Sequence, residues 1–261
     1  MAKKSRWEWK PTKNGIVEVT FFSWKYFHDF VRQEMLDYSH YVWRGQRDSA
    51  WKLESSLDRL LKRKMRSERE RLAKQHLERF KLSVRGRRGP NPAKLITDND
   101  WWALGQHHSL ATPLLDWTDS AFVALYFAFE KVDRPASGYR AVWALGGIEK
   151  EARKIEVAHS GTGRPPIVEY VRPAQDENAR LVSQGGLFTR SPLGVTVDQW
   201  VESTYAGQTN NAPLLKLNIP NDDRFDCLRT LNKMNINHIS LFPDLYGSGQ
   251  HCNKALEITK Y

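Results

Sequence analysis

An almost unbroken apolar segment between Ser120 and Glu130 constrains the fold of this chain more than any other feature. Its nine residues read Ala-Phe-Val-Ala-Leu-Tyr-Phe-Ala-Phe, without a single charge. A helix that is apolar on every side must be buried on every side. The segment therefore predicts a helix at the centre of the core, packed on a sheet.

Helical patterns fill the first half of the chain and strand patterns the second. Apolar spacings of three and four predict helices over 24–39 with Ser23 as N-cap, from Leu57 to Gly86 with Ser55 or Ser56 as cap, and from 98 or 99 to 106. Short β-rich segments lie at 41–43, 139–145, 167–171, 214–219 and 238–242. This order favours a single α+β domain, helix-rich in its N-terminal half and packed on a mixed or antiparallel sheet, over repeated βαβ units. We assign residues 1–22 to an N-terminal extension and 23–261 to the domain.

The positive charge is concentrated in one segment. Residues 62–94 hold thirteen basic and three acidic residues, which accounts for the whole net charge of +10. Such a field attracts polyanions, and nucleic acid is the partner we expect. A solvated basic helix and a docking surface for an acidic protein are the alternatives. The expected nucleic-acid-binding residues are Lys62, Arg63, Lys64, Arg66, Arg85, Arg87 and Arg88.

Several classes of protein are disfavoured. No apolar run reaches the length of a membrane span and the chain begins without a hydrophobic leader, so a soluble, cytoplasmic protein without a membrane partner is expected. Cys227 and Cys252 do not have metal or redox spacing, and we expect both to be reduced, buried thiols. The adjacent His107 and His108 point in different directions in either a helix or a strand, so no metal is expected. Neither phosphate-binding glycine motif occurs, which argues against kinases and dehydrogenases.

Two polar segments could form a binding site. Arg44 ends a β-prone run beside Gly45, where its planar fork could hold a phosphate or carboxylate and the glycine could let a ligand approach. Pairing of Arg44 with Asp116 or Asp58 is an equal alternative. The second segment, 106–118, places polar groups and a tryptophan directly before the apolar helix, as in a pocket for an amide or a ribose hydroxyl.

These segments also carry a resemblance. Trp43-Arg44-Gly45-Gln46 with the following 51–60, and Gln-His-His-x-Leu-x-Thr-x-Leu-Leu-Asp-Trp-Thr from residue 106, resemble the FRG-domain family. The segments 180–189 and 239–247 resemble later motifs of that family, in the same order. Trp43 stands where the family has Phe or Tyr, and the resemblance does not explain the basic helical insert at about 62–94.

The layout of the family is similar to that of ADP-ribosyltransferases, which implies NAD as co-substrate and a role in toxin–antitoxin or phage-defence systems. On this resemblance Arg44 holds the pyrophosphate or the adjoining ribose, and residues 112–118 line the nicotinamide-ribose site. The residues expected to bind NAD are Arg44, Gly45, Gln46, Gln106, His107, Thr112, Trp117, Thr118 and Gln184.

A carboxylate should stabilise cleavage of the nicotinamide bond, because the transition state resembles an oxocarbenium ion. The candidates are Asp116, Asp244 and Glu257, with Asp244 narrowly favoured because it follows an expected strand and a proline. A turn-forming role for Asp244, and an ion pair or helix cap for Asp116, are the alternatives. Glu257 lies in a second expected strand, 255–259. The expected catalytic residues are thus Arg44, Asp116 and Asp244.

The hypothesis is a mono-ADP-ribosyltransferase toxin that modifies nucleic acid. RNA is favoured because a reactive base must be accessible. The alternative is a non-catalytic nucleic-acid or nucleotide binding module held by an antitoxin or chaperone partner.

Overall fold

The computed structural model describes residues 5–161, 163–173 and 179–261. These residues form one eight-stranded mixed sheet in the order β1-β2-β8-β5-β3-β4-β7-β6. Its strands are β1 (Trp7–Trp9), β2 (Ile16–Phe21), β3 (Val42–Gln46), β4 (Leu114–Thr118), β5 (Tyr139–Leu145), β6 (Glu169–Val171), β7 (Gly186–Arg190) and β8 (Leu214–Pro220).

The pairing within the sheet is antiparallel except between β2 and β8, which run parallel. This confirms the expected mixed sheet. Residues 7–21, which the sequence analysis set apart as an extension, supply β1 and β2 and so belong to the same sheet.

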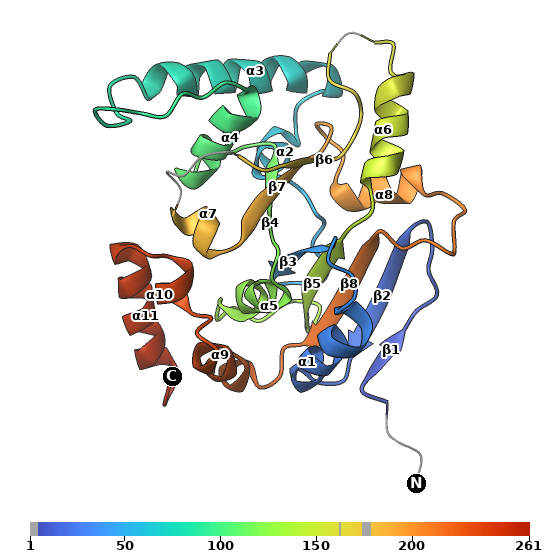
Figure 1. Cartoon of the computed structure of the whole chain (residues 1–261), viewed down its shortest axis with the longest axis vertical. Coiled ribbons are helices and arrows are strands. Elements are labelled where there is room, and N and C mark those ends of the chain that lie inside the picture. The colour runs from blue at the N-terminus through green and yellow to red at the C-terminus, as the bar shows by residue number, and fades with distance from the viewer. Residues whose placement is uncertain (1–4, 162, 174–178) are drawn as a thin grey trace.

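Helices cover both faces of the sheet, as Figure 1 shows. The first helical segment consists of a 3-10 turn (Trp24–Tyr26), α1 (Phe27–Phe30) and a π-helical turn (Val31–Met35). The remaining helices are α2 (Ser56–Leu61), α3 (Arg66–Ser83), α4 (Asp98–His107), α5 (Ala121–Phe129), α6 (Glu149–Ala158), α7 (Ala179–Ser183), α8 (Val197–Thr204), α9 (Arg224–Lys233), α10 (His238–Leu241) and α11 (Leu245–Glu257).

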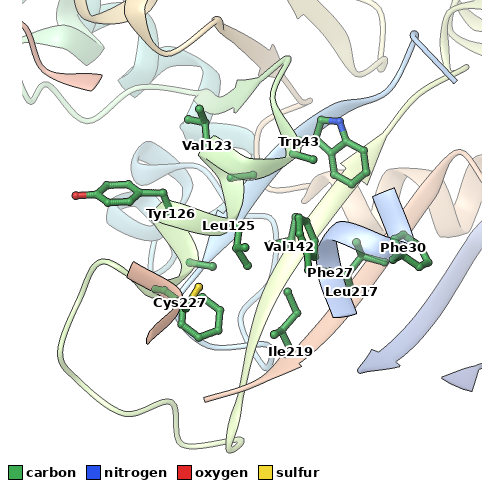
Figure 2. Packing of buried hydrophobic residues seen from close by; sticks show 14 of the residues in the cluster. Phe27, Phe30, Trp43, Val123, Leu125, Tyr126, Val142, Leu217, Ile219 and Cys227 are labelled. Carbon is green, nitrogen blue, oxygen red and sulfur yellow. The ribbon is translucent and has the colours of Figure 1, made fainter. Parts of the chain in front are cut away.

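The apolar helix α5 is the centre of the larger core, as predicted. The Ser120 side chain caps its first turn by accepting from the Val123 amide, and α5 packs on β3 and β5. Figure 2 shows its Leu125 beside Val142 of β5, with Cys227 of α9 nearby. A second core on the opposite face packs α6 and α8 against the sheet, and a third places α2, α3 and α4 beside β4 and β7.

Three predictions of secondary structure are wrong. Residues 238–241 form helix α10, started by the Asn237 cap, and 255–257 end helix α11, so neither segment is a strand. The basic helix does not continue from Leu57 to Gly86, because a turn at 62–65 separates α2 from α3. At 238–241 the capping box of Asn237 and Ser240 starts a helix, and this local signal outweighs the strand preference of the β-branched and aromatic residues.

The two cysteines differ in exposure. Cys227 is buried in the main core, and burial raises the pKa of its thiol. Cys252 is exposed on α11, contrary to expectation. None of the helices in the described part of the chain has both the length and the apolar character that a membrane crossing requires.

Candidate active-site cleft

The sheet divides between β3 and β4. In the described residues a single pair, Trp43 with Thr118, joins these strands, whereas β3 pairs along its length with β5, and β4 with β7. A cleft of about 900 Å³ opens here, and β3 and β4 supply its centre. It is lined by Trp43, Arg44, Gly45, Gln46, Arg47, Ala50, Trp51, Lys52, Glu54, Arg59, Lys62, Asp116, Trp117, Thr118, Phe127, Glu130, Lys131, Gln184 and Phe242.

Arg44 spans the division. Its Nη1 donates to the Asp116 carbonyl at 2.6 Å and lies 3.6 Å from that residue's Oδ2, while 20% of its side chain stays exposed. Its Nε is buried and has no hydrogen-bond partner among the described residues. Burial lowers the pKa of the Arg44 guanidinium, and the Asp116 charge opposes this shift. Arg44 therefore pairs with Asp116, one of the two partners weighed from the sequence, and also lines a cavity.

Gly45 has a structural reason to be glycine. A Cβ at this position would lie 2.0 Å from the Ala124 carbonyl oxygen and 2.5 Å from the Ala128 amide nitrogen. The missing side chain therefore lets the backbone of α5 approach β3, whereas we expected it to admit a ligand.

Gln106 and Thr112 lie outside the cleft lining and fix the position of Asp116 by hydrogen bonds. The Gln106 amide Nε2 donates to Asp116 Oδ2 at 3.0 Å, and its Oε1 accepts from the Thr112 hydroxyl. Thr112 is fully buried and does not line the cleft. These two residues orient Asp116, and the structure does not place either at the ligand surface.

Gln46 and Trp117 line the cleft with their polar groups already engaged. Gln46 Nε2 donates to the Lys52 carbonyl at 3.1 Å, and its Oε1 accepts from the indole of Trp143 at 2.8 Å. Trp117 Nε1 donates to the Thr189 hydroxyl at 2.8 Å. Both residues are buried, with 7% and 3% of their surface exposed, so they form the wall of the cleft more than its open surface.

Thr118 and Gln184 connect the two later sequence motifs to the cleft. The Thr118 hydroxyl donates to the Gln184 carbonyl at 2.6 Å, and Gln184 Nε2 donates to the Leu241 carbonyl at 3.0 Å. Leu241 is followed by Phe242, which also lines the cleft. All four sequence segments that carry the resemblance thus contribute residues to this cleft.

His107 lies elsewhere. It lines a separate pocket of about 470 Å³ with residues of α3, α4 and α7, beside His108. Burial lowers the pKa of His107, and the charges of His108 and Arg180 add to this. His107 was expected to bind the same ligand as Arg44, but it lies outside the cleft that Arg44 lines.

Asp244, the favoured catalytic acid, does not line the cleft either. Its carboxylate caps α11 by accepting from the Gly247 amide at 2.9 Å and pairs with Arg180 Nη2 at 2.5 Å. The Gly247 hydrogen bond and the Arg180 charge lower the pKa of this carboxyl group. Asp244 therefore has a structural role, but as a helix cap and ion-pair partner instead of the turn-forming residue that was weighed as its alternative.

Glu257 is also outside the cleft. It contacts Arg224 at 2.5 Å and Lys254 at 2.6 Å. Although burial raises the pKa of Glu257, these two cations lower it below its usual value. Of the three carboxylates proposed from sequence, only Asp116 is brought to Arg44.

Many of the residues that line the cleft were not predicted from the sequence. Six cations and three carboxylates surround the cleft: Arg44, Arg47, Lys52, Arg59, Lys62 and Lys131 against Glu54, Asp116 and Glu130. Five aromatic side chains accompany them, Trp43, Trp51, Trp117, Phe127 and Phe242. Phe127 and Glu130 are three residues apart, so both project from one side of α5. That spacing, at the polar end of the apolar helix, was a signal available in the sequence.

The predicted nucleic-acid-binding residues fall into two groups, one at the start of α3 and one beyond its end. Lys62 lines the cleft, and Arg63, Lys64 and Arg66 are exposed nearby. Arg85 and Arg87 are exposed beyond the other end of this helix of 18 residues, about 27 Å away. Arg88 donates to the Ala93 carbonyl at 2.7 Å and lies over the Trp101 ring, so it stabilises its own loop.

Comparison with known families identifies part of the chain. The model of the FRG domain matches residues 39–137, so this segment, which holds β3, β4 and α5, is an FRG domain. No protein of curated function and no solved structure matches the chain significantly. Among the described residues, no group of three or more His, Cys, Asp or Glu side chains is placed to hold a metal ion.

Proposed function

We propose that this FRG-domain protein is a mono-ADP-ribosyltransferase that binds NAD in the cleft between β3 and β4 and transfers ADP-ribose to nucleic acid, with RNA favoured. The observation that carries the proposal is the position of Arg44. Its guanidinium lies in a cavity of about 900 Å³ with an unpartnered buried Nε. The resemblance that suggested this activity also supports a role as a toxin in growth arrest or phage defence.

The chemistry of the lining fits a dinucleotide. Cavities of about 300–1,000 Å³ hold small-molecule ligands and cofactors. Arg47 and Lys52 are paired with Asp133 and Asp198 outside the lining, so Arg44, Arg59 and Lys62 are the cations that favour a pyrophosphate. In the described residues Arg59 and Lys62 form no ion pair with a carboxylate, so they too can meet phosphate oxygens. The rings of Trp51, Phe127 and Phe242, which are not fully buried, offer surfaces for adenine and nicotinamide.

The reaction needs a negative charge opposite the pyrophosphate-binding side. Loss of nicotinamide leaves a positively charged ribose carbon, which a nearby carboxylate stabilises in a site shielded from water. Asp116 and Glu130 lie in the same cleft as Arg44. The cleft therefore contains both charges that the reaction requires.

Replacement of Arg44 tests this function. We expect Arg44→Ala to reduce nicotinamide release by about 100-fold or more and to weaken NAD binding, because the cleft loses its buried bidentate donor. Arg44→Lys keeps the charge without the planar fork and should recover only part of both. Nicotinamide release is measured by chromatography with RNA, DNA or protein as acceptor, and NAD affinity by calorimetry.

A matched variant controls for folding and general charge. Arg153→Ala changes the same residue type on α6, away from the cleft, and should leave both readouts unchanged. Wild-type rates in Arg44→Ala would disprove the role of Arg44. Absence of NAD cleavage by the wild-type protein with every acceptor would disprove the enzymatic function.

One observation favours the non-catalytic alternative. Asp116 is already engaged by Arg44 and by Gln106, which reduces the negative charge available to a ribose cation. A binding module would hold a nucleotide through Arg44 and the aromatic rings without cleaving it. NAD or nucleotide binding by calorimetry, combined with no nicotinamide release, would support this second function.

If the exposed basic residues bind nucleic acid, the affinity for nucleic acid should fall steeply as the salt concentration rises. Arg63 and Lys64 lie close in sequence to Lys62 of the cleft, so a strand held there could reach the site. We expect Arg63→Gln with Lys64→Gln to weaken single-stranded RNA binding and to reduce the slope of log K against log salt by about one per lost phosphate contact. Fluorescence anisotropy at several salt concentrations measures this slope.

The second basic group provides the comparison. Arg85→Gln with Arg87→Gln removes the same charge beyond the far end of α3. An equal loss of slope would extend the RNA path along the whole helix. An unchanged slope in both double variants would instead favour a basic surface that docks an acidic antitoxin or chaperone.

A further inference from the structure

Glu130 is a shielded carboxylate that faces the cleft. It follows the last residue of α5, and 14% of its side chain is exposed. Its Oε2 lies 3.5 Å from His238 Nε2, and its Oε1 lies 3.5 Å from Lys131 Nζ. Lys131 is itself 56% exposed, so water weakens its attraction to Glu130.

A buried pair of side chains fixes the orientation of that histidine. The Tyr126 hydroxyl and His238 Nδ1 are 2.5 Å apart, and 3% of the His238 side chain is exposed. Burial lowers the pKa of His238 to about 4, with Lys254 and other nearby cations contributing, so the ring is neutral at pH 7. Burial and the neighbouring Tyr261 raise the pKa of Tyr126, so its hydroxyl is protonated. The Glu130 carboxylate, 3.5 Å from His238 Nε2, favours the neutral tautomer that carries its proton on Nε2, and in this tautomer Nδ1 accepts from the Tyr126 hydroxyl.

Three cationic side chains donate hydrogen bonds to backbone carbonyls of Glu130 and of the end of α5. Arg140 donates to the Ala128 carbonyl at 2.6 Å, Arg224 to the Glu130 carbonyl at 2.6 Å, and Lys254 to the same carbonyl at 2.7 Å. Cations are the expected partners for the last carbonyls of a helix. A carboxylate at the same helix end is electrostatically unfavourable. Departures from such local preferences concentrate at functional sites.

Asp116 and Glu130 differ in their surroundings. Asp116 is 58% exposed and contacts Arg44 and Gln106, whereas 14% of the Glu130 side chain is exposed and the ring nearest its Oε2, that of His238, is neutral. The buried cations Arg224 and Lys254 donate to the Glu130 backbone carbonyl, and the cation beside its carboxylate, Lys131, is solvent-exposed. Electrostatic stabilisation increases as water is excluded. Glu130 is therefore better placed than Asp116 to stabilise a cation.

We propose that Glu130 is the catalytic carboxylate which faces the ribose C1′ of NAD, and that His238 and Tyr126 are positioning residues that hold it there. This inference rests on the proposed function. In the reaction the bond from C1′ to the nicotinamide nitrogen breaks, and its electron pair leaves with neutral nicotinamide. A hydroxyl or amine of the acceptor nucleic acid then bonds to C1′, and its proton passes to the Glu130 carboxylate and on to water.

The isosteric Glu130→Gln variant tests the catalytic role. We expect the kcat for nicotinamide release to fall about 100-fold or more, with the calorimetric NAD affinity within about threefold of wild type, because only the transition state carries the cation. Asp116→Asn should reduce kcat less. Glu151→Gln on α6 makes the same change outside the cleft and should have no effect.

The positioning roles need a readout that folding alone would not change. His238→Ala should lower kcat at least tenfold without a matching rise in KM for NAD, and His238→Gln, whose amide can donate to Glu130, should restore part of it. Tyr126→Phe should give a smaller loss in kcat. Circular dichroism and thermal melting identify any variant that is unfolded. If a His238 or Tyr126 variant does not fold, the Glu130→Gln variant still tests the catalytic role of Glu130.

The outcomes separate this inference from the proposed function. An active wild type with an active Glu130→Gln variant overturns the inference and leaves the transferase function in place. Equal losses in His238→Ala and His238→Gln, with a raised KM, would make His238 a structural residue and overturn its positioning role. A wild type that binds NAD and never releases nicotinamide overturns both proposals.

Discussion

Gly45→Ala is expected to destabilise the folded protein by about 3 kcal/mol or more. Overpacking a core costs about 1–3 kcal/mol where side chains can adjust. Here the obstructing atoms are the backbone of α5, at 2.0 Å and 2.5 Å from the added Cβ, and a packed helix cannot move aside alone. The free energy of unfolding is measured by urea denaturation followed by circular dichroism.

A second glycine provides the control. A Cβ at Gly249 of α11 would meet no heavy atom within 4 Å. Gly249→Ala should leave stability unchanged or raise it by up to about 1 kcal/mol, since alanine favours a helix interior. A Gly45→Ala variant within about 1 kcal/mol of wild type would mean that α5 and β3 are not packed as closely as described.

Arg140→Met is expected to reduce the free energy of unfolding by about 3–4 kcal/mol. The Arg140 side chain is fully buried and donates to the carbonyls of Ala128, Lys131 and Asp133 and to the Asn221 side chain. Methionine fills similar space but removes the donor from the buried Ala128 carbonyl and from the part-buried Asp133 and Asn221 acceptors, while the Lys131 carbonyl keeps Arg224 as a donor. A buried acceptor without a partner costs more than the net gain of a hydrogen bond in folding. Burial lowers the pKa of Arg140 to about 10, so relief of its own desolvation offsets part of the loss.

An exposed arginine supplies the matched change. Arg229→Met removes a surface pair with Asp226 and should change stability by less than about 0.5 kcal/mol. Urea denaturation of both variants under the same conditions gives the comparison. Equal effects of the two substitutions would contradict the capping role of Arg140.

The secondary structure that could be predicted was the part fixed by local pattern. The strand 139–145 and the helix behind Ser120 are confirmed, and the helix starting at residue 98 is confirmed with a Thr97 cap. Each has a periodicity or a capping residue that acts within a few residues. The strand at 238–242 failed because Asn237 caps a helix there, a signal that outweighed the β-branched composition.

The candidate site could be predicted in part. Arg44, Asp116, Trp117 and Thr118 lie on the two strands that separate, so motifs from β3 and β4 marked the cleft correctly. The prediction that Asp244 is catalytic relied on a strand at 238–242 directly before it. That segment forms helix α10, and the Asp244 carboxylate pairs with Arg180 outside the cleft. Contacts between residues 64 positions apart leave no trace in a single sequence.

By itself the sequence determined the apolar helix, the concentration of positive charge and the motif residues around Arg44, because composition and short spacing are properties of neighbouring residues. The tertiary structure alone decided that β3 and β4 part to form a cavity and that Glu130 faces it beside His238. It also decided that Gly45 serves helix packing. These outcomes depend on which distant surfaces meet, and burial and charge pairing between them are settled only when the sheet and its helices pack together.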